Sequence, residues 1–216
     1  MRRLHGVPLV QVVRLLEQLS TATAAFHVEA DADVLQLLGP VGVADYWRFL
    51  VRAYGFVMPV ERAITQVPGL DDVLDIRRFH KHSLLRQDLL AFGMQADEID
   101  RVAQCPVPHL SSPPEALGWA YVIERSTLGH SNLFRHLGLV MTGDIAFTAA
   151  YLKCYFGAIG EMWRSFGNAV DRYADTPDSR RVIDAAKTAF RARRTWRRNH
   201  DFEQEPPSDS GLQRSA

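Results

Sequence analysis

The sequence predicts an all-α protein, a single domain of about six to eight helices, and three observations support this prediction. Apolar residues recur at helical spacing in almost every segment, and no segment shows the sustained alternation and hairpin turns of β-strands. The 216 residues are too few for two full-sized domains and ample for one core. A composition of 47% hydrophobic and 23% charged residues is that of a globular chain rather than a disordered one.

Two long helices are expected in the first third of the chain. The first, over residues 9–30, places a row of residues on one face at alternating spacings of four and three: Leu9, Val13, Leu16, Ser20, Thr23, His27 and Ala30. After a turn at Pro40 and Gly42, an apolar stripe over 46–64 predicts the second, which Gly55 and Pro59 should bend or interrupt. Short helices are then expected over 83–93 and 96–104.

The second half begins with a loop over 105–114, a segment that contains four prolines. Ser112, Pro113 and Glu115 form a capping box that predicts a helix to about residue 137. Asp144 should cap a further long helix to about 173, and a last helix should run from 176 to about 198. The domain is therefore expected over 1–198, with a disordered polar tail over 199–216.

Charge and cysteine content narrow the function classes. Lys and Arg total 25, as do Asp and Glu, so bulk positive charge does not indicate a nucleic-acid binder. Cys105 and Cys154 are too few for a disulfide framework and suggest reduced thiols. The most apolar window, 145–159, is too short and too polar to span a bilayer. The sequence is that of a cytoplasmic protein, without a membrane partner.

His27 lies on the apolar stripe of the first expected helix, so its ring should point inward. Two interpretations are open: a hydrogen-bonded core histidine, or a metal or haem ligand, because imidazole is the commonest metal ligand in proteins. Gly129 poses a similar question, since a glycine inside a helix costs about 1 kcal/mol relative to alanine. Either a second helix or a flat ligand close to its backbone would account for it.

Three segments of the chain together carry a resemblance to a known family. They are Thr-x-x-x-His at Thr23 to His27, Tyr-Gly-Phe-x-x-Pro-x-Glu over 54–61, and Ser-Thr-Leu-Gly over 126–129. With these motifs in this order, the sequence resembles the bacterial haem (heme) oxygenase family, in particular the branch that supplies biliverdin to bacterial phytochromes. The resemblance covers roughly residues 10–197.

The resemblance implies a haem oxygenase-like helical bundle with haem between the first helix and a kinked distal helix. His27 would be the iron ligand, while Ser126, Gly129 and His130 would shape the site that oxygen and protons reach. Haem would be both cofactor and substrate: with O2 and electrons from outside, it is opened to biliverdin, carbon monoxide and iron. No nucleotide-binding motif is present, so the reductant would be a separate ferredoxin or flavoprotein reductase.

The distal segment departs from the family pattern at two positions. The family usually reads Glu-Gly-Ser-Thr-Leu-Gly-Gly, whereas residues 124–130 here read Glu-Arg-Ser-Thr-Leu-Gly-His. An inward Arg125 would crowd the haem or pair with a propionate. An inward His130 would either ligate iron from the distal side and block oxygen, or donate a hydrogen bond within the site.

The basic residues that would hold the propionates are also displaced. The family often has them seven and three positions before the proximal histidine, where this chain has Ser20 and Ala24. Arg164 is a candidate substitute, or else a solvated arginine. The basic end of the last helix is either favourable charge at a helix C-terminus or a docking surface for an acidic partner such as a reductase, or for a nucleic acid. It comprises Arg191, Arg193, Arg194, Arg197 and Arg198.

The leading hypothesis is therefore a haem oxygenase that uses an external reductase and passes biliverdin to a bacterial phytochrome. Its main rival is a carrier or sensor on the same fold, in which His27 and His130 both ligate haem that is never turned over. A third interpretation is a haem-free helical scaffold for protein contacts.

Overall fold

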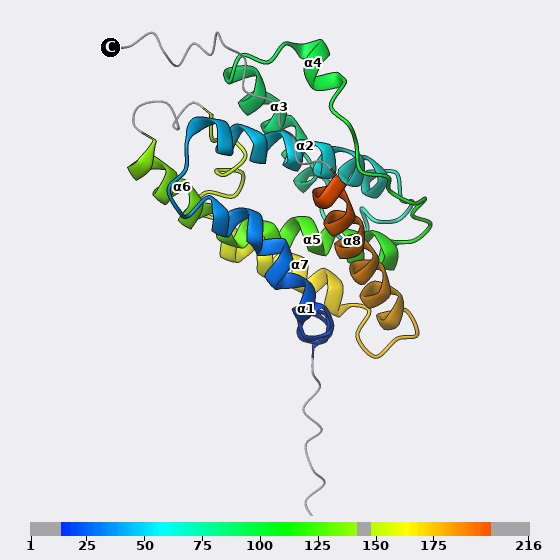
Figure 1. Cartoon of the computed structure of the whole chain (residues 1–216). Helices are drawn as coiled ribbons and strands as arrows, with labels where there is room; N and C mark the ends of the chain where they lie inside the picture. Colours follow the sequence, from blue (N-terminus) through cyan, green and yellow to red (C-terminus); the bar gives the residue numbers. More distant parts are fainter. Residues whose placement is uncertain (1–13, 142–147, 200–216) are drawn as a thin grey trace, which may run out of the picture.

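The computed structural model describes residues 14–141 and 148–199, and all regular secondary structure in these ranges is helical (Figure 1). The predicted all-α class is therefore confirmed. In chain order the elements are α1 (Leu15–Gln36), α2 (Val43–Thr65), the 3-10 turn η1 (Ile76–Arg78), α3 (Lys81–Ala91), α4 (Ala96–Asp100), α5 (Pro113–Ser126), the 3-10 turn η2 (Thr127–Gly129), α6 (His130–Val140), α7 (Ile159–Asp171) and α8 (Ser179–Asn199). No helix of this part of the chain is long and apolar enough to cross a bilayer.

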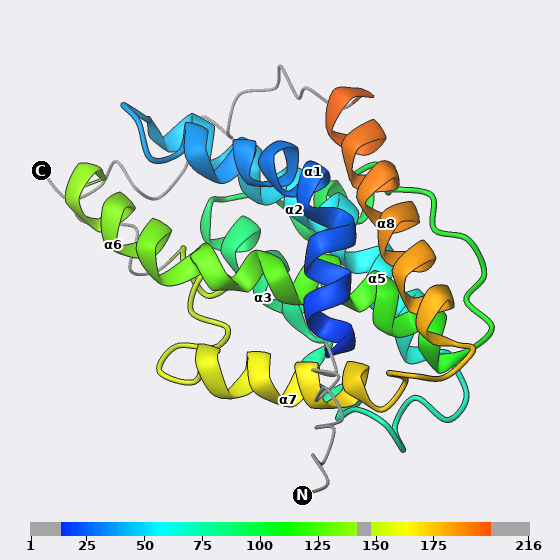
Figure 2. The ribbon, with the colours of Figure 1, turned by 90° about the horizontal axis from the view of Figure 1, so that it is seen from below.

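Helix α5 forms the centre of the molecule. It packs on α8 most extensively and also on α2 and α7, while α1 crosses this layer and packs on α8 and α7 (Figures 1 and 2). Gly118 permits the close approach of α5 to α8, because a Cβ there would lie 2.5 Å from the Val182 carbonyl oxygen. Trp119 and Tyr121, each about 1% exposed, fill the core on either side of this contact.

The helix predicted to run from Ser112 to about residue 137 is divided into two by η2. Ser126 Oγ donates to the Ile123 carbonyl at 2.7 Å, and Thr127 Oγ1 donates to the Glu124 carbonyl at 2.7 Å. Such hydroxyl bonds to the preceding turn compete with the backbone ladder and bend helices. The α5–η2–α6 segment therefore turns at the Ser-Thr-Leu-Gly motif (Figure 2).

Several predicted boundaries need correction. Helix α2 runs without interruption through Gly55 and Pro59. Among the described residues the Ser112 hydroxyl has no hydrogen-bond partner, and Glu115 instead accepts bonds from the backbone N–H and hydroxyl of Ser111. The predicted long helix from Asp144 begins outside the described residues, and its α-helical part begins only at Ile159. Residues 200–216, in the expected tail, also lie outside them.

A buried ion network links α2, α3 and α5. Lys81 and Glu124 are both about 1% exposed or less, and Lys81 Nζ lies 2.9 Å from Glu124 Oε1. Arg78 Nη2 donates to Glu124 Oε2 at 2.6 Å. Glu61 of α2 accepts the backbone N–H of Lys81 at 3.0 Å, a carboxylate at a helix N-terminus. This contact explains why α3 begins at Lys81, two residues before the predicted start.

Candidate functional site

A cavity of about 310 Å³ lies between α1 and the η2 kink. Its walls come from three helical segments that are distant in sequence, and its lining residues are Ala30, Asp31, Val34, Leu35, Arg125, Ser126, Leu128, Gly129 and Arg193. Most of the α1 and η2 contribution is aliphatic, whereas Arg125 and Arg193 add positive charge and Asp31 adds one negative charge. Such a cavity suits a flat apolar ligand that carries carboxylates.

His27 lies on α1 one turn before Asp31, so the two residues share a helix face. Its Nε2 atom is 2.9 Å from Thr23 Oγ1 and 3.3 Å from the Tyr121 hydroxyl. The ring also packs against Phe190 of α8, with 5.6 Å between centroids. Burial, with a smaller contribution from Arg125, lowers the pKa of His27. The imidazole is therefore neutral at physiological pH, the form that binds metals.

Arg125 forms a two-point ion pair with Asp31 of α1. Its Nη1 and Nη2 atoms lie 2.7 and 2.9 Å from the two carboxylate oxygens of Asp31. The hydrogen bond from Arg125 lowers the pKa of Asp31, and the same bond raises the pKa of Arg125. The side chain that replaces the expected distal glycine is thus directed across the cavity to the opposite helix.

Gly129 keeps the space beside the kink open. A Cβ at this position would meet Val34 Cγ1 of α1 at 3.9 Å, with no other heavy atom within 4 Å among the described residues. The glycine is therefore not required by helix packing in this arrangement. Its effect is to leave the backbone of η2 bare on the side that faces α1, where a flat ligand would approach it.

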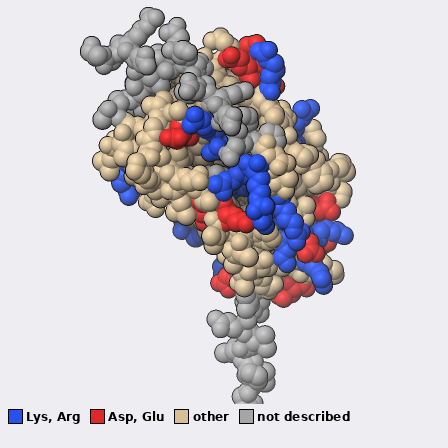
Figure 3. All heavy atoms as spheres, viewed as in Figure 1, with Lys and Arg blue, Asp and Glu red and all other residues tan. Residues whose placement is uncertain are grey.

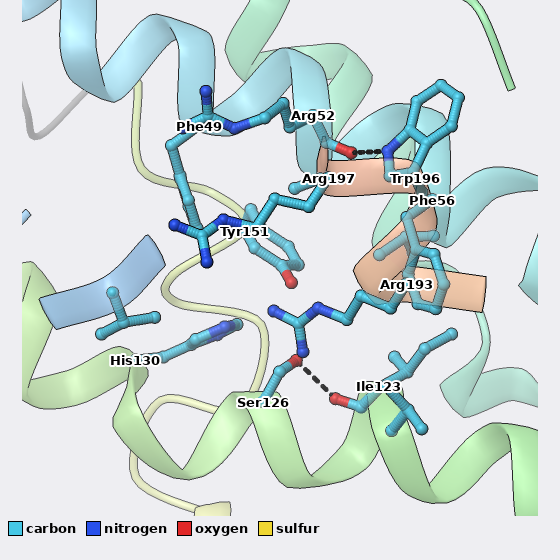
Figure 4. A pocket seen from close by; sticks show the side chains of 14 residues that line it. Phe49, Arg52, Phe56, Ile123, Ser126, His130, Tyr151, Arg193, Trp196 and Arg197 are labelled. Atoms are coloured by element: carbon cyan, nitrogen blue, oxygen red, sulfur yellow. Dashed lines mark hydrogen bonds between the residues drawn. The ribbon is translucent and has the colours of Figure 1, made fainter. Parts of the chain in front are cut away.

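A second cavity, of about 40 Å³, lies deeper, between α2, α5 and α8 (Figure 4). Ser126 and His130 line it from the distal segment, together with Tyr151 and Arg193. The His130 ring is 2% exposed and packs edge-on against Tyr151 at 4.6 Å between centroids. Burial, aided by the nearby charge of Lys81, lowers the pKa of His130 to about 3. His130 is therefore a neutral, inward-directed side chain.

Arg193 connects these spaces, because it lines both cavities and also a surface hollow of about 110 Å³. In Figure 4 its guanidinium lies between Ser126 and Tyr151. Among the described residues it forms no ion pair with a carboxylate. Its guanidinium lies 6.0 Å from the Phe56 ring centroid, and its charge adds to the larger effect of Arg125 in lowering the pKa of Asp31. In the sequence, Arg193 is one of five arginines at the basic end of the last helix. Only the packing of α8 shows that its side chain lines the cavities.

The other candidate cations lie elsewhere. Arg164 is exposed on α7, outside the residues that line the cavities, and its role as a propionate partner stays a prediction. The surface hollow is lined by Phe26, Phe190 and the basic end of α8, and Lys and Arg side chains form a band over that helix (Figure 3). No group of three metal-ligating side chains occurs in the described ranges.

Comparison with known proteins gives a family and a similar fold. The model of a family described as "Heme oxygenase" matches residues 13–199. A crystal structure of the NO- and CO-bound heme oxygenase from Neisseria meningitidis is similar in fold, with a TM-score of 0.71 and 21% sequence identity, covering 91% of this chain and 98% of that one. No curated protein matched the chain.

Proposed function

This chain belongs to the heme oxygenase family, and on that premise we propose that it binds haem in the cavity between α1 and η2, with His27 as the iron ligand. Its function is that of a haem oxygenase, an oxidoreductase. The observation that carries the proposed site is the position of His27 on the α1 face that continues into the cavity wall at Ala30, Asp31 and Val34.

The residues of the cavity fit haem in chemical class. The aliphatic walls suit the porphyrin, and the neutral imidazole of His27 has the lone pair that iron requires. Arg193, which has no carboxylate partner within the described chain, is the cation we assign to a propionate. Arg125 is available to a second carboxylate only if it leaves Asp31.

When bound, haem supplies the iron that activates O2 and is itself the molecule opened to biliverdin, carbon monoxide and iron. The protein contributes shape and hydrogen bonds. Bare backbone at Gly129 would leave room for a small molecule beside bound haem. The Ser126 hydroxyl donates its hydrogen to the Ile123 carbonyl, so its oxygen can accept a hydrogen bond from water. The neutral imidazole of His130 can donate a hydrogen bond to water or accept one from it. Water is then the carrier of protons to the site.

The electrons come from outside the chain, and a ferredoxin or flavoprotein reductase is the class of donor we propose. The basic band over α8 suits the acidic surface of such a partner. A bacterial phytochrome is the acceptor we propose for biliverdin, and the cytoplasm is the compartment where these partners meet.

The test is a haem titration followed by reduction in air. We expect one-to-one binding, and conversion of the Soret band to biliverdin absorption with ascorbate or a ferredoxin system. His27→Ala should lose the axial ligand and weaken binding by about tenfold or more, whereas His109→Ala, at an exposed loop histidine, should not. A stable low-spin complex that yields no biliverdin would favour a non-catalytic carrier instead.

A further inference from the structure

The Arg125–Asp31 ion pair is a direct bridge between α1 and the end of α5. Both of its hydrogen bonds are short, and the Arg125 side chain is only 19% exposed, against 44% for Asp31. Elsewhere α1 packs on α8 and α7. The pair therefore spans a gap in which α1 faces the distal segment across a cavity rather than across packed side chains.

The position of the pair restricts that cavity. Both residues line it, and the bridge joins the two walls between which a flat ligand would have to lie. A cavity of about 310 Å³ is at the lower limit for a drug-sized ligand, which needs about 300–1,000 Å³, and haem is larger than most such ligands. Since side chains at His27 and Asp31 share one helix face, a ligand seated on His27 extends toward the bridge.

We infer that Arg125 and Asp31 form a gate that closes this cavity and must part before haem can occupy it. This inference rests on the proposed function, because it concerns access to the same site. A ligand that binds only the open form has its apparent affinity reduced by the fraction of open molecules. The arginine that replaces the family's distal glycine thus controls access to the site.

The expected effect follows from the exposure of the pair. The stabilisation from a partly exposed, two-point ion pair is near the upper end of the range measured for surface ion pairs. Loss of the pair should therefore raise the fraction of molecules with an open cavity by about fivefold. Salt weakens such a pair, although a partly buried contact pair is screened less than charges in open solvent. The ion pair therefore lowers the fraction of open molecules most strongly at low salt.

The experiment measures haem association by stopped-flow absorbance for the wild type, Asp31→Asn and Asp100→Asn. Asp100 pairs with Arg86 between α4 and α3, away from the cavity, and serves as the matched control. We expect Asp31→Asn to bind haem about fivefold faster than the wild type at low salt, and the ratio to fall toward one near 1 M salt. Asp100→Asn should match the wild type throughout.

Amide hydrogen exchange before haem is added gives a second readout. Exchange over α1 near Asp31 should be faster in Asp31→Asn than in the wild type or the control. If the wild type binds haem and Asp31→Asn is no faster, or if the salt dependence of the two is the same, the gate is overturned while the proposed function stands. If the wild type gives no Soret complex at all, the proposed function fails and the gate fails with it.

Discussion

Replacing Lys81 by methionine should destabilise the fold strongly, because it removes one charge from a buried ion network. Lys81 Nζ has three partners, all buried: Glu124 Oε1 at 2.9 Å, the Arg78 carbonyl at 3.0 Å and the Tyr155 hydroxyl at 2.9 Å. Burial opposes its charge, but Glu124, Tyr155 and Glu61 together raise the pKa of Lys81, so it is a cation in the folded protein.

The magnitude follows from what the substitution leaves behind. Removing one partner of a buried ion pair costs about 3–5 kcal/mol, because the other charge stays buried without it. Glu124 retains Arg78 at 2.6 Å, which places the loss near the lower end, about 3 kcal/mol. Methionine has a similar length, so no cavity term is added. For a chain of this size the melting temperature should fall by about 6–12 °C.

Urea unfolding followed by circular dichroism measures this loss, with Arg77→Met as the control. Arg77 pairs with Asp75 at 2.8 Å on the surface, so its removal should change stability very little. The double variant Lys81→Met/Glu124→Gln should lose less than the sum of its two single variants, since they share one interaction. A loss below about 1 kcal/mol for Lys81→Met would refute the argument that this network holds α3 to α5.

Two further predictions concern a buried acid and the helix packing. Burial raises the pKa of Asp88 to about 6, so the folded state holds its proton more tightly than the unfolded state does. Relative to Asp88→Asn, the wild type should lose up to about 3 kcal/mol of stability as pH rises from about 4 to 6, and a rise instead would contradict this. Gly118→Ala should destabilise by about 1–3 kcal/mol or more, because its Cβ would lie 2.5 Å from the Val182 carbonyl oxygen. Gly138→Ala, with open space around it, should stabilise α6 by up to about 1 kcal/mol; thermal melts of the pair test both.

Periodicity predicted most helices well because the apolar stripes that sequence shows are the faces that pack. The stripe from Tyr46 to Ile64 is buried along α2 almost as expected. Predictions from local propensity were wrong where tertiary contacts determine the course or the start of a helix. Gly55 and Pro59 are helix breakers by propensity, yet Gly55 serves close packing, since a Cβ there would lie 2.4 Å from Trp196 Cζ2. The start of α3 was misplaced because Glu61, twenty residues earlier, caps it.

At the candidate site, too, some residues could be predicted from the sequence and others only from the structure. A histidine on an apolar stripe and a glycine within a helix were visible in the sequence. Gly129 lines the cavity, and His27 lies on α1 one turn before Asp31 of the cavity wall. The partner of Arg125 was not visible, because Asp31 is 94 residues away and neither residue belongs to a common motif. Arg193 was one of five arginines in the sequence, and only the packing of α8 directs it to both cavities.

Because α8 is the last helix and packs against α5 and α1, the core can be completed only at the end of synthesis. Roughly 160 residues separate the end of α1 from the end of α8. At about 5–20 residues per second, the ribosome needs about 10–30 s to make them. Until α8 has been made, it cannot cover the apolar face of α1 or, once α5 has been synthesised, that of α5. The nascent chain therefore exposes these apolar faces until its last helix has been made, and its core closes late, through contacts between distant segments.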